Sequence, residues 1–349
     1  MSLSKPSFRA SDVVVVGAGL IGLGIALELA DRGAAVTVID RGRSLAGAST
    51  AAAGMLAAED PGNPRELQSL SRLSIERYPG FLRRIEELSG IAVAFQTDTT
   101  IQHLEDGSTV RLAEQSLDPR ELAAALYAAV RQTSIELLEE TPIASIRDSS
   151  GGITVQLGGD SAVTTHAVLY AAGAWTSEVM SALDVEPVSI HPRKGQMLRV
   201  RLPFPLNVVH RSERVYIVPR TLGPQAGTAL IGATVEDAGF DTSVRSEDLN
   251  ALRALAAELL PEFASASAAP LVEAWAGLRP TTLDGLPIVG ACMQRGRFVA
   301  TGHYRNGILQ APGTAVIMAD LLEGKSPAID TSALSPLRFV LQSSGKAGA

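Results

Sequence analysis

Three glycines and one acidic residue near the N-terminus are spaced for binding a dinucleotide. Residues 17–22 read Gly-Ala-Gly-Leu-Ile-Gly, and Asp40 follows about 20 residues further on. In this pattern the first glycine permits a tight turn, the second lets the backbone approach a pyrophosphate, and the third lets a helix pack closely on a strand. A carboxylate then accepts hydrogen bonds from a ribose diol. The predicted dinucleotide ligands are Gly17, Ala18, Gly19, Leu20, Ile21, Gly22 and Asp40.

The segments around these residues have the pattern of a strand, a helix and a second strand. Residues 12–16 are valine-rich, as in strands of parallel sheets that are buried on both faces. Apolar residues within 20–30 share one helical face, and Gly33 follows as a stop signal. Residues 35–39 form the second valine-rich strand. A packing turn without a nucleotide is the alternative, but this context favours dinucleotide binding. The fingerprint alone does not separate NAD from FAD.

Periodicity and turn residues predict the remaining elements. Helices are expected at 64–88, 118–130 and 246–260, and a last helix is expected from the end of the turn 302–307 to residue 322. Strands are expected at 135–145, 153–157, 162–170, 196–200, 215–218, 229–231 and 298–301. The helix predicted at 64–88 should be interrupted at Tyr78-Pro79 and end at Gly90. Asp118 and Glu121 should form a capping box at the beginning of the next helix. Residues 1–11 and 343–349 are expected to be loose ends.

Further motifs resemble glycine oxidases of the D-amino acid oxidase superfamily. The stretch similar to that family's flavin-contacting loop is Thr50, Ala51, Ala52, Ala53, Gly54, Met55 and Leu56. Residues 216–220, 276–281 and 302–309 agree in order and spacing, and 168–175 resembles the second flavin-contacting turn. Because these motifs extend over nearly the whole chain, the resemblance implies FAD rather than NAD.

The resemblance implies an α/β fold with an α+β substrate lobe. A Rossmann-like FAD-binding domain (12–80, 140–185 and 270–340) is interleaved with a substrate domain (81–139 and 186–269). The antiparallel sheet of the substrate domain would cover the flavin ring. The expected cofactor-binding residues beyond the fingerprint and the flavin loop are Arg41, Ala172, Gly173, Trp175, Arg279, His303, Arg305, Asn306, Gly307 and Ile308.

The resemblance also implies how FAD and substrate are held. FAD should be noncovalent, since Leu278 stands near the position of the cysteine that attaches flavin in monomeric sarcosine oxidases. The lone Cys292 is then a small buried hydrophobe. Arg279 matches the arginine that pairs with the substrate carboxylate, and Tyr216 matches the tyrosine that assists it. Salt bridging is the alternative role for Arg279.

Two further positions bear on the substrate. Arg305 matches a second arginine over the active site, although it could instead hold its loop. Val235 stands where glycine oxidases commonly have methionine, near the substrate. A smaller residue there would leave room for an N-alkyl group or a side chain.

The chemistry implied is oxidative deamination of glycine or a small amine. Hydride leaves the α-carbon for flavin N5, so no protein base is required and no catalytic residue is assigned. Oxygen would reoxidise the flavin to give hydrogen peroxide, and the imine would hydrolyse to glyoxylate or feed thiamine biosynthesis. Sarcosine, N-alkyl glycines and small D-amino acids stay open as substrates. A dehydrogenase with another acceptor, an electron-relay subunit and an NAD-linked dehydrogenase also stay open.

Composition narrows the partners and the location. The net charge of -7, with no Lys/Arg block, disfavours nucleic acid and anionic membranes. One cysteine excludes an intrachain disulfide, and the scattered histidines show no metal-ligand spacing. The longest apolar stretch falls short of the about 20 residues of a membrane span. We therefore expect a cytoplasmic protein without a metal, and by resemblance a homotetramer.

Overall fold

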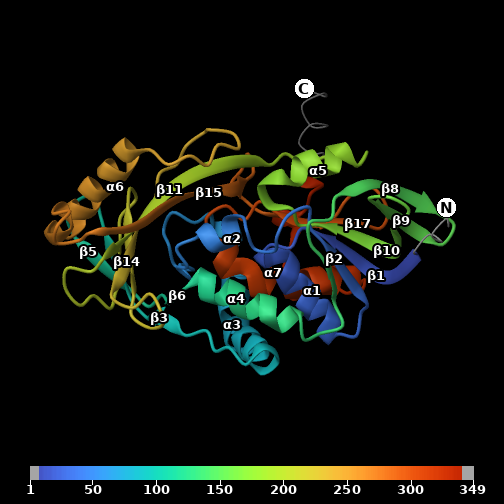
Figure 1. The fold of residues 1–349 in the computed structure, drawn as a ribbon, viewed down its shortest axis with the longest axis horizontal. Helices are drawn as coiled ribbons and strands as arrows, with labels where there is room; N and C mark the ends of the chain where they lie inside the picture. The colour runs from blue at the N-terminus through green and yellow to red at the C-terminus, as the bar shows by residue number, and fades with distance from the viewer. Residues whose placement is uncertain (1–7, 340–349) are drawn as a thin grey trace, which may run out of the picture.

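The computed structural model describes residues 8–339, which form two large sheets with helices between and around them (Figure 1). The first sheet has the strand order β16-β17-β10-β1-β2-β7, and β9 joins β10 and β8 at its side. Its strands are β1 (Phe8–Val16), β2 (Val36–Ile39), β7 (Glu136–Leu138), β8 (Ile143–Ser149), β9 (Gly152–Leu157), β10 (Ala162–Tyr170), β16 (Ile288–Ala291) and β17 (Arg297–Thr301). The predicted α/β fold is confirmed.

The centre of this sheet is parallel and buried on both faces. β1 pairs with β2 and β10 in parallel, and β10 pairs with β17 in parallel. Val13 and Val15 point into one hydrophobic cluster, whereas Val14 and Val16 point into another. The alternation of a strand therefore sends neighbouring valines to opposite faces. This explains why the sequence of β1 reads as an uninterrupted apolar run.

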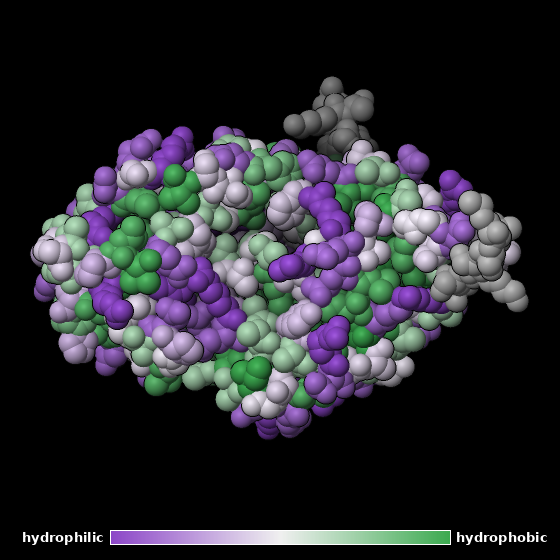
Figure 2. Space-filling model, in the orientation of Figure 1, coloured by the Kyte–Doolittle hydropathy of each residue, from purple (hydrophilic) through white to green (hydrophobic). Residues whose placement is uncertain are grey.

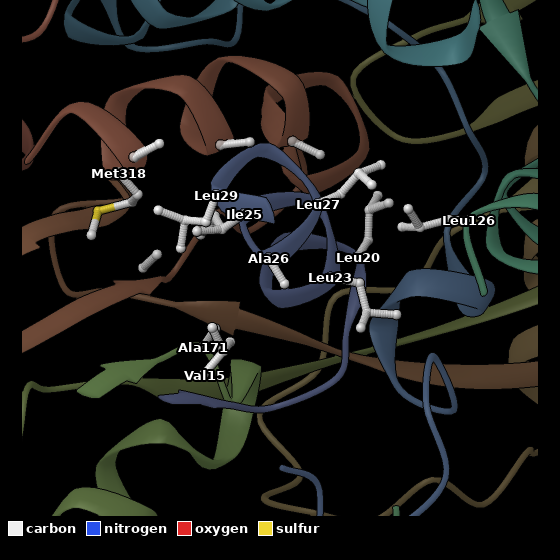
Figure 3. Packing of buried hydrophobic residues seen from close by; sticks show 14 of the residues in the cluster. Val15, Leu20, Leu23, Ile25, Ala26, Leu27, Leu29, Leu126, Ala171 and Met318 are labelled. Carbon is white, nitrogen blue, oxygen red and sulfur yellow. The ribbon is translucent and has the colours of Figure 1, made fainter. Parts of the chain in front are cut away.

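Four helices lie on one side of the sheet. They are α1 (Leu20–Asp31), α3 (Gln68–Ser89), α4 (Pro119–Val130) and α7 (Gly307–Leu322). Helices α1 and α7 contact the strands, and α3 and α4 pack against these two helices. Figure 3 shows α1 between Val15 and Ala171 on the sheet side and Met318 of α7. The shorter helices are α2 (Ala48–Ala51), α5 (Thr176–Ala182), η1 (Arg65–Leu67), η2 (Gly173–Trp175) and η4 (Ser332–Leu334).

The second sheet has the order β15-β11-β14-β13-β12-β4-β5. Its strands are β4 (Thr100–His103), β5 (Thr109–Leu112), β11 (His191–Arg201), β12 (Val209–Arg211), β13 (Tyr216–Arg220), β14 (Thr228–Gly232) and β15 (Leu271–Thr281). Helix α6 (Ser246–Leu259) and η3 (Pro261–Ala264) pack against it, and β3 (Phe95–Thr97) pairs with β6 (Ser116–Leu117) separately. All of its pairs are antiparallel except β12 with β4.

The sheet pairing bears on the expected domains, which stay a prediction. β15 lies in the range assigned to the FAD-binding domain, but it pairs with β11 over nearly its whole length. β15 therefore belongs structurally to the antiparallel sheet. β16, β17 and α7 return to the first lobe as expected.

Three local predictions were wrong. Residues 8–11 are not a loose tail, because they continue β1 and pair with β10. The expected strand 135–145 is two strands, β7 and β8, with Glu140 at positive φ between them. Asp118 does cap α4 by accepting the N–H of Arg120, but the Glu121 carboxylate has a buried oxygen with no hydrogen-bond partner among the described residues. The N-terminal residues 1–7 and the expected loose end at 343–349 lie outside the described residues.

Helix α3 also differs from expectation, because it continues through Pro79. A proline inside a helix removes one hydrogen bond and costs about 3 kcal/mol. Buried residues of α3 on both sides of Pro79, including Leu70 and Ile85, belong to the main core with α7. This packing outweighs the local preference. Gly90 ends the helix with φ 71°, as predicted.

Tyr78 connects α3 to the beginning of α7. Pro312 lies inside α7 and has no N–H, so the carbonyl of Ile308 lacks its usual helical donor. The hydroxyl of the buried Tyr78 donates to this carbonyl at 2.5 Å. One side chain therefore satisfies a main-chain group that the helix itself cannot.

Among the described residues, no helix is long and apolar enough to cross a membrane.

We predict that Tyr78→Phe lowers the free energy of unfolding by about 1–3 kcal/mol, because it leaves the Ile308 carbonyl buried without a donor. Urea-induced unfolding measures this. Tyr127→Phe is the matched control, since the half-buried Tyr127 hydroxyl donates to Glu139 and water can replace it. Equal losses in the two variants would contradict the argument.

Candidate active site

One cavity of about 1990 Å³ lies between the two sheets and is lined by residues of both. Figure 2 shows the surface hollowed near the middle of the molecule. Ligand pockets are commonly about 300–1,000 Å³, so this cavity has room for a large cofactor together with a small substrate.

The glycine turn forms one end of the cavity wall. Gly17 has φ 112°, and a Cβ there would lie 2.5 Å from the carbonyl oxygen of Ala171. A Cβ at Gly22 would lie 2.0 Å from the carbonyl oxygen of Gly17. Gly17, Gly19, Leu20 and Ile21 line the cavity. Ala18 and Gly22 do not line the cavity, but they belong to the same turn.

Asp40 lies beside this turn at the end of β2 and lines the cavity with Arg41. One carboxylate oxygen accepts the N–H of Ala18 and the other accepts the N–H of Gly42, each at 2.8 Å. Each oxygen keeps acceptor capacity, because a carboxylate oxygen has two lone pairs. The backbone thus fixes the carboxylate while leaving it able to bind a diol.

The expected flavin loop is held from both sides. Ala51, Ala52, Ala53, Gly54 and Met55 line the cavity. Gly54 has φ 87°, and a Cβ there would lie 2.0 Å from the carbonyl oxygen of Leu117. Thr50 and Leu56 do not line the cavity. The Thr50 hydroxyl donates to the carbonyl of Leu45, and Leu56 is buried with its N–H on Gln115.

The antiparallel sheet fixes the same loop from the other lobe. Trp275 donates its indole N–H to the carbonyl of Ala51 at 3.1 Å. The buried Arg220 donates to the carbonyl of Ala53 at 2.8 Å and pairs with Asp118 at 3.1 Å. The loop is therefore positioned mainly through its carbonyl groups.

The two remaining cofactor motifs also reach the cavity. Ala172, Gly173 and Trp175 line it at the end of β10. His303, Arg305, Asn306, Gly307 and Ile308 line it at the beginning of α7. Asn306 donates to the side chain of Asn63 at 2.9 Å. Burial lowers the pKa of His303 to about 3, and its Nε2 lies 3.0 Å from the hydroxyl of Thr314. His303 is therefore neutral at physiological pH.

Arg279 and Tyr216 lie together at the other end of the cavity. A Cβ at Gly195 would lie 2.3 Å from both terminal nitrogens of Arg279, and one at Gly232 would lie 2.6 Å from the Tyr216 hydroxyl. Glycines therefore make room for both functional groups. Burial raises the pKa of Tyr216, and the charges of Arg279 and Arg305 oppose this shift.

Comparison with known proteins decides the family. The family model described as FAD dependent oxidoreductase matches residues 12–116 and 107–321, which is most of the chain. The chain belongs to this family of FAD-dependent oxidoreductases. It is therefore an oxidoreductase that uses FAD.

Individual proteins are similar to this chain in sequence and in structure. The chain is 34% identical to glycine oxidase of Geobacillus kaustophilus over 97% of this chain and 98% of the relative. The crystal structure of glycine oxidase from that organism superimposes with a TM-score of 0.87 at 31% identity, covering 95% of this chain and 99% of that one. A bifunctional protein ThiO/ThiG of Trichormus variabilis is 33% identical over 90% of this chain, which spans 53% of that relative.

The residues of the cavity fit FAD. Helix α1 begins at Leu20 directly after the glycine turn, so its positive N-terminal end lies where a pyrophosphate would bind, and Ser49 accepts the N–H of Leu20. Asp40 supplies a ribose acceptor, and the loop at 51–55 together with the beginning of α7 supplies a wall of small residues and backbone. Cys292 does not line the cavity, and burial raises its pKa to about 12. It is packed as a hydrophobic residue beside β16.

Val235 is the predicted site residue that the structure separates from the site. Its side chain is 47% exposed, and it is absent from the cavity wall, where Ala233 lies instead. The chain leaves β14 at Gly232, so the strand's alternation no longer decides which side chains point inward. The expected effect of Val235 on substrate size is therefore unsupported.

Sequence reasoning missed some residues that shape the site. Ser49 accepts the N–H of Leu20 at 2.9 Å, and Gly195 provides the space for Arg279. Gly195 carried a signal, because a glycine within a strand indicates close approach of another group. Arg220 lay in a quoted motif, but its contact with Ala53 has no signal in local sequence.

We predict that Asp40→Asn weakens FAD binding by about 10- to 100-fold, because a charged acceptor for the ribose is lost. Titration of the apoprotein with FAD, followed by flavin fluorescence, measures the dissociation constant. Asp330→Asn is the matched control, because Asp330 also accepts the N–H of the residue two positions later but lies outside the cavity wall. A dissociation constant that does not change in Asp40→Asn would refute the assignment.

Proposed function

We propose that this FAD-dependent oxidoreductase oxidises the α-carbon of glycine or a small N-substituted glycine, with oxygen as final acceptor and hydrogen peroxide as product. The observation that carries the proposal is the pairing of Arg279 with Tyr216 at the end of the cofactor cavity. Relatives named glycine oxidase, including the one 34% identical over 97% of this chain, support glycine as substrate.

Arg279 provides the recognition of a carboxylate. Its Nη1 donates to the main-chain carbonyls of Thr234 at 3.1 Å and Lys194 at 3.4 Å, and its side chain also interacts with the Tyr216 hydroxyl. The guanidinium has five N–H donors, so donors remain for a carboxylate beside these contacts. These carbonyls orient the guanidinium without neutralising it. A small amino acid bound here has its α-carbon a short distance from the carboxylate anchor.

Tyr216 supplies a neutral hydroxyl next to this anchor. Burial raises its pKa, so the hydroxyl keeps its proton at physiological pH and can donate to the carboxylate. In the structure this hydroxyl lies 2.8 Å from the sulfur of Met197, which is a weak acceptor. A substrate carboxylate is a stronger acceptor, and a hydroxyl can rotate its proton toward it.

No protein base is needed in the proposed reaction. FAD, when bound, supplies the chemistry by accepting hydride from the α-carbon. Arg279 and Tyr216 hold the carboxylate, and the neutral His303 is engaged with Thr314 rather than free to take a proton. The imine then hydrolyses to an oxo acid and ammonia. Sarcosine, N-alkyl glycines, small D-amino acids and a role in thiamine biosynthesis stay predictions.

The first test of this function is anaerobic reduction of the purified holoprotein. Glycine is expected to bleach the flavin band near roughly 450 nm, and air should restore it with formation of peroxide. Sarcosine and D-alanine in separate cuvettes rank the substrates. Bleaching without recovery in air would instead support a dehydrogenase or an electron-relay subunit. A flavin that none of the three reduces would overturn the small-amino-acid assignment.

We predict that Gly195→Ala raises the KM for glycine at least about 10-fold while FAD content stays at the wild-type level. The added Cβ overlaps the guanidinium of Arg279 and must displace it, and such a loss of a charged hydrogen bond is worth about 1.5–3 kcal/mol. Initial rates of peroxide formation measure the KM. Gly158→Ala should change nothing, because a Cβ at Gly158 meets no atom within 4 Å. An unchanged KM in Gly195→Ala would argue against Arg279 as the anchor.

A further inference from the structure

Lys194 is a charged residue buried immediately behind the arginine of the substrate site. Its side chain is 0% exposed, and its ammonium lies 2.8 Å from a carboxylate oxygen of Asp241 and 3.6 Å from one of Glu236. Lysine is almost never fully buried without such partners, because desolvation of the ammonium is costly. Nothing in the proposed reaction uses this charge. Its position therefore requires another explanation.

The main chain of Lys194 is part of the support of Arg279. The N–H and carbonyl of Lys194 pair with the carbonyl and N–H of Glu236, at 3.0 and 2.9 Å. Arg279 donates to the carbonyl of Lys194 and to that of Thr234. The two carbonyls that orient the guanidinium thus lie on two chain segments, β11 and the loop that follows β14. Their separation depends on how firmly those segments are joined.

The loop of residues 233–245 has little else to hold it. None of its side chains is buried, and Val235, Phe240 and Val244 are exposed. Its apolar contacts include the packing of Ala233 on the cluster around Met197 and the stacking of Phe240 on Trp175 in the other lobe, with ring centroids 5.6 Å apart. A segment with so few buried apolar contacts opens at low free energy unless polar contacts restrain it.

Polar contacts from β11 provide this restraint. The amide of Gln196 donates to Glu236 and Asp248, its side-chain oxygen accepts the N–H of Arg245, and its main-chain N–H donates to the hydroxyl of Thr234. Lys194 adds its buried ammonium to Asp241 and Glu236, and the neighbouring Arg193 adds a partly exposed guanidinium 3.7 Å from Asp237.

Both carboxylates that face Lys194 are charged. The hydrogen bond from Lys194 lowers the pKa of Asp241. Burial would raise the pKa of Glu236, but hydrogen bonds from Thr234 and Gln196 and the charge of Lys194 bring it below its ordinary value. The ammonium therefore joins two anionic points of the loop to β11.

We propose that Lys194 is a positioning residue for the substrate carboxylate, because it fixes the 233–245 loop against β11 and so holds the two carbonyl oxygens that orient Arg279. This inference rests on the proposed function of Arg279 as carboxylate anchor. A merely stabilising role would not require a charge, since apolar replacements of buried ion pairs are often neutral or stabilising.

The test compares Lys194→Met and Lys194→Arg with the wild-type holoprotein. Asp241 is 48% exposed, so water can solvate it when the ammonium is removed and Lys194→Met is expected to fold. In anaerobic reduction by glycine, Lys194→Met should raise the half-saturating glycine concentration at least about 10-fold, with a limiting rate within about threefold of wild type. Lys194→Arg should recover much of the loss. Lys325→Met is the control, because Lys325 is an exposed, ion-paired lysine.

Limited trypsin digestion gives a readout that does not depend on activity. Arg245 is half exposed at the end of the loop, and Lys194→Met should increase cleavage after it several-fold at unchanged FAD content. Unchanged cleavage and unchanged half-saturation would overturn the proposal, as would equal impairment by Lys194→Met and Lys194→Arg. A third outcome separates the two proposals: glycine does not reduce the flavin of the wild type, yet Lys194→Met is cleaved faster. This would support the attachment of the loop by Lys194 and reject the proposed function.

Discussion

The site depends on the close contact between the flavin loop and β15. A Cβ at Gly277 would lie 2.5 Å from the Cβ of Ala51, so a larger residue at 277 would separate the two lobes. The indole of Trp275 holds the loop from the same strand, and Arg279 lies two residues beyond Gly277. Because one strand contacts the expected flavin loop and carries Arg279, the proposed carboxylate anchor, the distance between this loop and Arg279 is set by the covalent geometry of a few residues. This is the kind of rigid positioning that a hydride transfer needs.

The beginning of α7, which lines the cavity, is also held by contacts from another element. Pro312 would leave the Ile308 carbonyl without a donor, and Tyr78 of α3 replaces the missing hydrogen bond. Nearby, the hydroxyl of Ser74 in α3 accepts the N–H of Gly313 at 3.0 Å. The helix end that faces the cofactor is thus held by side chains of a neighbouring helix. Local propensity alone would have allowed it to fray or bend.

Sequence patterns predicted the parts of the structure that local signals determine. The strand–glycine–helix beginning at Val13 was found because its valine run, its turn and its helical face all agree. Pro79 was misleading, because the packing of α3 against α7 outweighs a local preference. Val235 was assigned by resemblance alone, and the structure places it exposed in the loop after β14. Gly195 and Lys194 act through contacts between distant segments, which spacing along the chain does not show.

The way Arg279 is held explains why its charge is available to a ligand. A carboxylate partner would orient the guanidinium equally well, but it would compete with the substrate for the same donors. The structure uses two main-chain carbonyls instead, which orient Nη1 without cancelling the charge. The acidic residues Glu236 and Asp241 pair with Lys194, and Glu236 pairs with Arg245 as well, rather than with Arg279. Arg279 is therefore oriented by groups that do not neutralise it. Its positive charge remains in the cavity, where it attracts an anionic carboxylate.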